Sequence, residues 1–396
     1  MECYDGEGTA TETHTKEVND LIFHFNKSRQ RRICAVFDFD MFYVAVELAD
    51  KPWLASRPVV VKGDCIDRPI VTSANYVARQ YGIKAGMPVW QAHKCVKNLV
   101  VLKQRKDQQQ KISETAMDIL RAYDANMISP SLDEAKVELG PYLMKTYGEM
   151  TYEHAEGVVS NIRAAILQTT KLTISAGISC NFLMAKMASD FKKPNGQYTI
   201  REEAIDSFLS PLPIRKLHGI GPELEKKLTN GFRIYTGGDL KRRLPDIFAS
   251  NTSQKAALLK LAIGWCDKVN VFKPQLTYSA QRTFHAKQGE EVQRILTELC
   301  DELGRRIVKD RIYARKLVLR YVMKTPRGPI PCKTTIGLGM EKRRTPADEE
   351  INVRSAEDIR QCTLPQLPPD PLSFLCIELK AIGQIPKRTM DMFLKQ

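Results

Sequence analysis

Residues 34–43 read CAVFDFDMFY, and this stretch decides the fold class. Apolar residues from Ile33 to Phe37 predict a buried strand, which runs into two carboxylates, Asp38 and Asp40. Because side chains at positions i and i+2 of a strand project to the same face, both acids should lie together at one end of a sheet. Burying two carboxylates costs free energy unless a cation neutralises them. A metal ion, a basic partner or solvent at the strand end could each do so, and the motif alone leaves all three open.

The chain has 396 residues, enough for more than one hydrophobic core, since single cores stop growing at about 250–300 residues. Its 60 Lys and Arg residues exceed its 46 Asp and Glu residues, which gives a formal net charge of +14 at pH 7. This excess favours a polyanionic partner, either nucleic acid or an anionic membrane, although solubility alone is the simpler alternative.

The ten cysteines are scattered without CxxC spacing and the six histidines are equally dispersed, which argues against a zinc site or a disulfide framework. No apolar run approaches the roughly 18–20 residues of a membrane span, so we expect no membrane association. Residues 1–17 are polar and acidic, unlike a signal or transit peptide, and we expect them to be disordered.

A second pair of acids, Asp133 and Glu134, begins the strand-like sequence SLDEAKVEL. Strict alternation places Asp133 with Ala135 and Val137 on the apolar face, and Glu134 on the opposite face. The two acids therefore converge only if the chain bends where the strand begins. Without a bend, the sequence fits a surface strand with one stray acid.

The sequence TSANYVARQYG predicts a turn into a helix, with Thr72 or Ser73 as the N-cap. Tyr76 and Arg79 would then lie one turn apart on the same helix face. A hydroxyl, a phenol, a guanidinium and free N–H groups can together bind a phosphate. Lys193, in DFKKPNG, would add a second cation, although each of these residues taken singly also fits a solvated surface.

Residues 217–228, LHGIGPELEKKL, fit a helix-hairpin-helix motif. Gly219 and Gly221 would let backbone N–H groups approach a DNA phosphate closely, whatever the base sequence. Leu224 and Leu228 would point inward from the second helix. An ordinary tight turn between two helices is the alternative interpretation.

Together these motifs resemble the Y-family of translesion DNA polymerases, in which they occur in this order and at about this spacing: FDFDMFYVAVE, TSANYVARQYGIKAGMP, SLDEA, SAGISCNFLMAKMASDFKKPNG and the glycine hairpin. The resemblance covers roughly residues 32–325 and is greatest to the DinB and polymerase kappa branch. It implies an α+β multidomain fold, a right-hand polymerase with an α/β palm, small fingers, a helical thumb that holds the helix-hairpin-helix, and an α/β little finger.

The resemblance also implies the roles of the site residues. The catalytic metal ligands would be Asp38, Asp133, Glu134 and the backbone carbonyl of Phe39, which would hold two Mg²⁺ ions, with Mn²⁺ as a substitute. The nucleotide contacts would be Tyr43, Ser73, Tyr76, Arg79 and Lys193, with Tyr43 as the steric gate that excludes a 2′-OH. Gly219 and Gly221 would contact DNA, whereas Asp40 would support the structure.

The domains expected from the resemblance are an N-terminal tail (1–30, partly disordered), a palm (31–41 and 107–199), fingers (42–106), a thumb (200–270), a linker (271–279), a little finger (280–385) and a C-terminal tail (386–396). Residues 301–345 hold 13 Lys and Arg residues against 4 Asp and Glu residues. This charge suits the little finger as a DNA-gripping module with salt-dependent binding.

The implied function is low-fidelity, template-directed DNA synthesis past damaged bases, with primer–template DNA and dNTP as partners. We expect a monomer in the nucleus, with the mitochondrion or the bacterial cytoplasm as alternatives. In the C-terminal tail, Met390, Phe393 and Leu394 have the spacing of a sliding-clamp motif, although a frayed apolar tail fits equally well.

Two alternative functions belong to other classes. A non-catalytic DNA-binding scaffold of the same fold would not need Asp38, Asp133 and Glu134 together. A metal-dependent nuclease or phosphatase is disfavoured by Tyr43 and the residues that would bind a triphosphate. A phosphatase of the haloacid-dehalogenase type is also disfavoured because Phe42 replaces the Thr or Val expected two positions after the second acid.

Overall fold

The computed structural model describes residues 12–27, 31–63, 69–250, 252–266, 277–310, 312–313, 316–337, 356–363, 366–367, 372–380 and 383–384. The described residues form two compact units, one drawn from residues 1–61, 73–80 and 104–272, the other from 62–72, 81–103 and 273–396. The predicted palm and thumb fall in the first unit and the predicted little finger in the second, whereas the predicted fingers are divided between the two.

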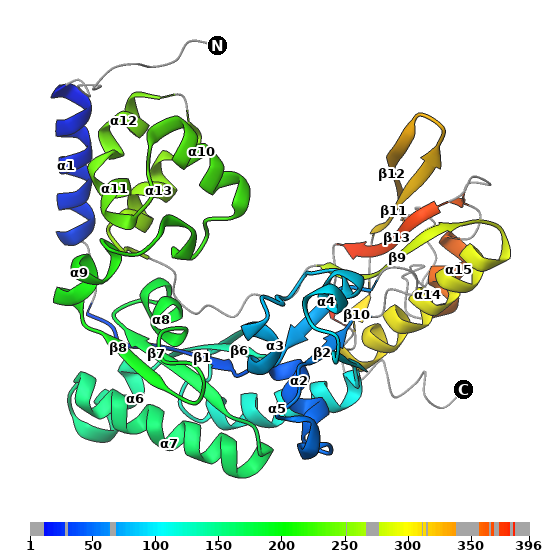
Figure 1. Cartoon of the computed structure of the whole chain (residues 1–396), viewed down its shortest axis with the longest axis horizontal. Coiled ribbons are helices and arrows are strands. Elements are labelled where there is room, and N and C mark those ends of the chain that lie inside the picture. The colour runs from blue at the N-terminus through cyan, green and yellow to red at the C-terminus, as the bar shows by residue number, and fades with distance from the viewer. Residues whose placement is uncertain are drawn as a thin grey trace, which may run out of the picture. The chain divides into compact units, whose positions relative to one another are not determined.

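A five-stranded sheet forms the palm, with β1 at its centre (Figure 1). The strand order is β5 (Ile128–Ser131), β6 (Glu134–Glu138), β1 (Cys34–Phe39), β7 (Ile174–Ser179) and β8 (Gln197–Ile200). β1 is antiparallel to both of its neighbours, and β7 is parallel to β8. The predicted buried strand is therefore confirmed, and it extends two residues past Phe37.

The two faces of this sheet are covered by different helices, as the alternation of β1 requires. Ala35 and Phe37 face a core that they share with α5 (Lys106–Arg121) and α7 (Tyr152–Thr170). Cys34 and Val36 face α8 (Phe182–Ser189) on the opposite side. Asp38 has the parity of Val36, so its side chain projects toward the α8 face.

Close packing of α8 on β7 depends on Gly177. A Cβ atom at this position would lie 2.0 Å from the carbonyl oxygen of Ala185 and 2.2 Å from the amide nitrogen of Ser189. Only glycine allows the two backbones to approach so closely. The SAGIS sequence thereby fixes how near α8 comes to the strand end that carries the acids.

The elements between β1 and α5 form the rest of the predicted fingers and palm, together with α6. A three-stranded sheet has the order β3 (Val71–Ala74), β2 (Val59–Lys62) and β4 (Val100–Lys103). The helices are α2 (Phe42–Leu48), η1 (Pro52–Leu54), α3 (Tyr76–Gln80), α4 (Val89–Cys95) and α6 (Gly140–Tyr147).

The thumb is helical, as predicted, and packs around a core that also includes Met184 of α8. Its elements are η2 (Glu202–Ala204), α9 (Ile205–Leu209), η3 (Ile214–Lys216), α10 (Pro222–Phe232), α11 (Gly237–Arg242), α12 (Leu244–Ala249) and α13 (Lys255–Ala262). Both α1 and the thumb core belong to the first unit.

Helix α1 (Glu12–Lys27) includes residues 12–17, so the expectation that these residues are disordered is wrong. The reason is tertiary. Val18 is buried in the thumb core, and the Trp265 Nε1–H donates a hydrogen bond to the Phe25 carbonyl at 3.1 Å. Docking of the apolar face stabilises the whole helix, including its polar first turns.

The second unit contains a four-stranded sheet of order β12, β11, β13, β9 that packs on α14. Its elements are β9 (Thr277–Lys287), α14 (Glu290–Asp310), β10 (Ile312–Tyr313), β11 (Lys316–Thr325), β12 (Gly328–Gly337), α15 (Ala356–Thr363), β13 (Leu372–Lys380) and β14 (Gly383–Gln384). Residues 277–279 of the predicted linker are strand, whereas the predicted clamp motif in 386–396 lies outside the described residues. Among the described helices, none is long and apolar enough to cross a membrane.

Candidate active site at the end of the palm strand

Asp38 and Glu134 lie directly opposite each other in the antiparallel register of β1 and β6. Opposite residues of an antiparallel pair project to the same face, so the two carboxylates are neighbours. Asp133 lies in the turn between β5 and β6, and its carbonyl accepts a hydrogen bond of 2.9 Å from the Phe39 N–H. The bend that the sequence required is present, and it brings the second acidic pair to the end of β1.

The carboxylate of Asp133 has a different partner from those of Asp38 and Glu134. It accepts a hydrogen bond of 2.6 Å from the Ser131 hydroxyl. The pKa of Tyr43 is raised, first by burial and then by the negative charge of Asp133, so the two side chains lie within electrostatic reach. Tyr43, the predicted steric gate, is half-buried on α2.

Two lysines neutralise the acids. Lys186 of α8 forms ion pairs with Asp38 and, at 2.8 Å, with Glu134. Lys193 also pairs with Asp38 and lies 3.7 Å from Asp190. Burial alone would raise the pKa of Asp38, but the ammonium groups of Lys193 and Lys186 more than offset it, so this pKa lies below its ordinary value.

Lys186 is the site residue that the sequence interpretation missed. It stands in LMAKMAS, a helix whose other residues are mostly apolar, and its side chain is only 14% exposed. Burial would lower its pKa, but the charges and hydrogen bonds of Asp38 and Glu134 raise it above the ordinary lysine value. The sequence feature that could have identified Lys186 is a single lysine on the sheet-facing side of an apolar helix.

Asp40 is almost fully buried and supports the site from behind, as the sequence predicts. Its carboxylate accepts hydrogen bonds from the Ser175 hydroxyl at 2.8 Å and from the Asn195 N–H at 2.7 Å. The Tyr76 hydroxyl donates a third, longer bond at 3.4 Å. Asp40 therefore links the end of β1 to β7 and α3.

The predicted phosphate-binding residues are arranged only partly as expected. Tyr76 and Arg79 do share a face of α3, since the guanidinium lies 5.0 Å from the ring centroid. The predicted cap is wrong: Thr72 and Ser73 lie in β3, and the Asn75 side chain accepts the Ala78 N–H instead.

Ser73 is buried in its strand. Residues 71–74 form strand β3 and not the start of the helix, because Val71, Ser73 and the residue that follows suit a buried strand. The cap then falls to the first Asx residue after the strand.

The glycine hairpin has the geometry that the motif predicts. Gly219 has φ +107°, which disfavours every residue with a Cβ atom, and Gly221 directly precedes α10 as its N-cap. Leu228 is buried in the thumb core and Leu224 packs against it. The first helix of the motif is short, a single 3₁₀ turn at Ile214–Lys216.

The donor chemistry of the acids fits a hard divalent cation. Carboxylate and carbonyl oxygens are the ligands that Mg²⁺ and Mn²⁺ prefer. Asp38 and Glu134 meet side by side, with the Phe39 backbone at the same strand end. Within the described parts of the chain, no three His, Cys, Asp or Glu side chains are gathered into a metal site.

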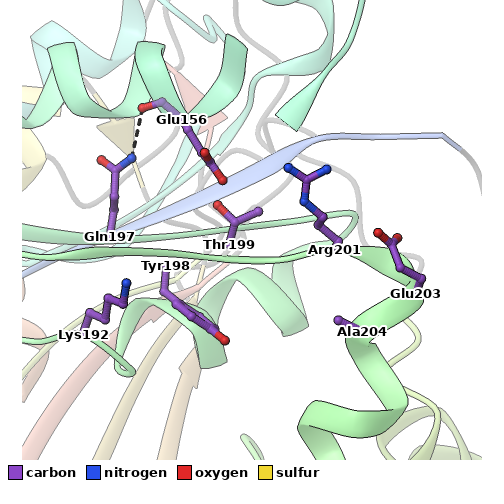
Figure 2. A pocket seen from close by; sticks show the side chains of 8 residues that line it. All are labelled: Glu156, Lys192, Gln197, Tyr198, Thr199, Arg201, Glu203 and Ala204. Atoms are coloured by element: carbon purple, nitrogen blue, oxygen red, sulfur yellow. Dashed lines mark hydrogen bonds between the residues drawn. The ribbon is translucent and has the colours of Figure 1, made fainter. Parts of the chain in front are cut away.

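A separate pocket of about 390 Å³ lies on the palm and contains none of the predicted site residues (Figure 2). Figure 2 shows Gln197 of β8 donating to the Glu156 carbonyl of α7, a bond of 3.0 Å. Arg201 is paired with Glu153 at 2.5 Å. Because acids and bases line it together, the pocket shows no preference for a charged ligand.

Two family models match parts of this chain. Residues 37–190 match the model of the impB/mucB/samB family, and residues 202–232 match the model of the helix-hairpin-helix motif of the same family. The second match covers η3 and α10 and supports the assignment of the glycine hairpin.

Curated relatives are bacterial proteins named DNA polymerase IV. One from Legionella pneumophila (strain Lens) is 43% identical over 206 residues, which cover 52% of this chain and 56% of the relative. One from Alkalilimnicola ehrlichii is 38% identical over 213 residues, which cover 54% of this chain and 58% of the relative. The chain thus matches a little over half the length of these relatives.

Among solved structures, a Y-family DNA polymerase chimera superposes with a TM-score of 0.70 at 22% sequence identity. The superposition covers 89% of this chain and 100% of the chimera. The likeness shows that the right-hand polymerase fold extends through both compact units.

Proposed function

We propose that this chain is a member of the Y-family of DNA polymerases and that it catalyses template-directed, low-fidelity DNA synthesis past damaged bases. The observation that carries the proposal is the pairing of Asp38 with Glu134 at the end of β1, beside the turn that holds Asp133. The relatives named DNA polymerase IV are consistent with the DinB branch.

The proposed metal ligands are Asp38, Asp133, Glu134 and the Phe39 carbonyl, with Mg²⁺ as the ion and Mn²⁺ as its substitute. Two such ions, when bound, lower the pKa of a primer 3′-OH and neutralise charge on the α-phosphate and the leaving pyrophosphate. The chain's own contribution is to hold the acids at the end of a strand whose apolar side chains are buried.

The nucleotide contacts are proposed on the same basis. Tyr43 sits on α2 within electrostatic reach of Asp133, where its ring would pack against the sugar and exclude a 2′-OH. Arg79 and Tyr76, stacked on one face of α3, would bind phosphate oxygens, together with Lys193. Ser73 is the weakest member of this set because it is only 6% exposed.

The proposed macromolecular partner is primer–template DNA. Gly219 and Gly221 would present backbone N–H groups to the duplex backbone, and the basic second unit would add salt-dependent contacts. A monomeric state and binding of a sliding clamp through residues 386–396 remain proposals. The bacterial relatives favour the bacterial cytoplasm over the nucleus as the compartment.

Primer extension tests the proposal directly. The intact protein should extend a primer on an undamaged template with Mg²⁺ and single dNTPs, and the double variant Asp133→Ala/Glu134→Ala should not. Equal binding of primer–template DNA by both proteins is the control for folding. If neither protein extends the primer while both bind it, the alternative of a non-catalytic DNA-binding scaffold replaces the polymerase.

A further inference from the structure

The ammonium group of Lys186 lies between two carboxylates that come from different strands. It pairs with Asp38 of β1 and, at 2.8 Å, with Glu134 of β6. All three side chains are largely buried, with exposed fractions of 14%, 14% and 16%. Ion pairs with so little solvent around them are screened far less than surface pairs.

Packing at Gly177 and hydrogen bonds of Asn181 and Ser189 fix the backbone that carries Lys186. Gly177 allows α8 to pack directly on β7. Asn181 caps α8 by accepting the Met184 N–H at 3.0 Å, and its amide group donates to the Gly264 carbonyl at 2.9 Å. The Ser189 hydroxyl donates to the Lys186 carbonyl at 2.8 Å. The ammonium therefore reaches the acids from a rigid base.

Two other lysines near the acids are placed differently. Lys193 pairs with Asp38 but stands in the segment after α8, where it also lies near Asp190. Lys136 comes within only 3.9 Å of Glu134. Lys186, by contrast, contacts both members of the acid pair from an ordered helix.

We propose that Lys186 is a positioning residue of the metal site: it holds Asp38 and Glu134 side by side and limits how tightly they bind a divalent cation. The inference deepens the proposed function and rests on it, since it takes these acids to be metal ligands. Its physical basis is charge. Two adjacent carboxylates repel each other, and a fixed ammonium between them reduces that repulsion. The same positive charge repels a divalent cation that binds the same oxygens.

Removal of the Lys186 charge should therefore raise the metal affinity and lower the turnover rate. Lys186→Met removes the cation that contacts both acids and puts a side chain of similar length in its place, while Lys193 still pairs with Asp38. We expect this variant to bind Mn²⁺ at least about threefold more tightly, because the repulsion from the Lys186 charge is lost. We expect kcat to fall at least about tenfold, because the acids are no longer held in register. A purely structural lysine would weaken metal binding and turnover together.

Lys186→Arg is the conservative variant, since it keeps the charge and can bridge two carboxylates. It should bind Mn²⁺ within about twofold of the parent protein and recover most of the kcat lost in Lys186→Met. Lys145→Met, an exposed lysine of α6, is the matched control and should change neither quantity. Thermal unfolding of each variant tells a folding defect from a change in the site.

The measurement is a Mn²⁺ titration followed by electron paramagnetic resonance, on the full chain bound to a dideoxy-terminated primer–template and the matching dNTP. The inference is overturned if Lys186→Met takes up Mn²⁺ with the affinity of the parent protein, or more weakly. If the parent protein itself takes up no Mn²⁺ and extends no primer, the proposed function fails first. A parent protein that binds Mn²⁺ and extends primers, with an unaltered Lys186→Met variant, rejects this inference alone.

Discussion

Asp38 stands directly opposite Glu134 across β1 and β6, and one lysine, Lys186, is paired with both. The arrangement shows what neutralises Asp38 at the end of the buried strand, whereas Asp40, the second acid of the sequence motif, accepts hydrogen bonds from neutral donors. A cation within the protein itself neutralises the pair of Asp38 and Glu134, and it comes from a helix 148 positions after Asp38 in the sequence. The unpaired alternative, two buried carboxylates with no cation, would cost far more free energy.

Substitution of Tyr43 by alanine should admit ribonucleotides. The ring is half-buried beside Asp133, and its removal would open the space that a 2′-OH needs. We expect the ratio of ribonucleotide to deoxynucleotide insertion, measured as kcat/KM, to rise at least about tenfold, or 1.4 kcal/mol. Insertion of dNTP should change little. Unaltered sugar discrimination would reject Tyr43 as the gate.

Gly177→Ala should destabilise the protein and displace α8. The new Cβ atom would meet the Ala185 carbonyl oxygen at 2.0 Å, so the helix must move away from β7. We expect the free energy of unfolding to fall by about 1–3 kcal/mol in urea titrations. Gly157→Ala in α7 is the control, because nothing lies within 4 Å of its Cβ position. That variant should be unchanged or more stable by up to about 1 kcal/mol. Equal stability of the two variants would contradict the close approach of α8.

Arg105→Met should destabilise the protein more than loss of a surface ion pair would. Arg105 bonds Glu47, whose side chain is only 3% exposed, at 2.7 Å. We expect a loss of about 2–3 kcal/mol, less than for a fully buried pair, because Gln109 and the backbone N–H of residue 105 still donate to Glu47.

Arg121→Met is the control for that experiment. Its partner Asp118 is 72% exposed, so the substitution should cost under about 0.5 kcal/mol in the same unfolding titration. The interpretation of Glu47 as a buried acid that depends on Arg105 fails if both variants lose the same stability.

Tyr76→Phe should change how stability depends on alkaline pH. Burial, and then the charge of Asp40, raise the pKa of Tyr76 from 10 to about 12. Between these two values the unfolded chain loses the phenol proton and the folded chain keeps it. The parent protein therefore loses stability as the pH rises from 10 to 12, by up to about 1.4 kcal/mol per unit from this group.

The Phe variant lacks this contribution, so its stability deficit relative to the parent protein should shrink over that window. Urea unfolding at pH 8 and pH 11 measures the difference, with Tyr81→Phe, an exposed tyrosine, as the control. A deficit that stays constant from pH 8 to pH 11 would show that Tyr76 is not protected from ionisation.

Local sequence patterns predicted several helices, strands and turns of this protein correctly. The apolar run before Asp38 forms β1, the pattern after Asn75 forms α3, and the GIG sequence forms the turn before α10. These features follow from side-chain alternation, helical periodicity and the conformational freedom of Gly219, which depend on neighbours in the sequence. Resemblance to a family then supplied the expected roles of the site residues.

Tertiary structure alone decided how those elements meet. Alternation separated Asp133 from Glu134, and only the β1–β6 register and the turn at Asp133 bring them to the same strand end as Asp38. The placement of Lys186 depends on α8 packing against Gly177, a contact between segments that sequence patterns treat as independent. Charge pairing and close packing depend on distances in space and not on distance along the sequence. The sequence therefore identified the acids, and the fold determined which of them are neighbours and which cation they share.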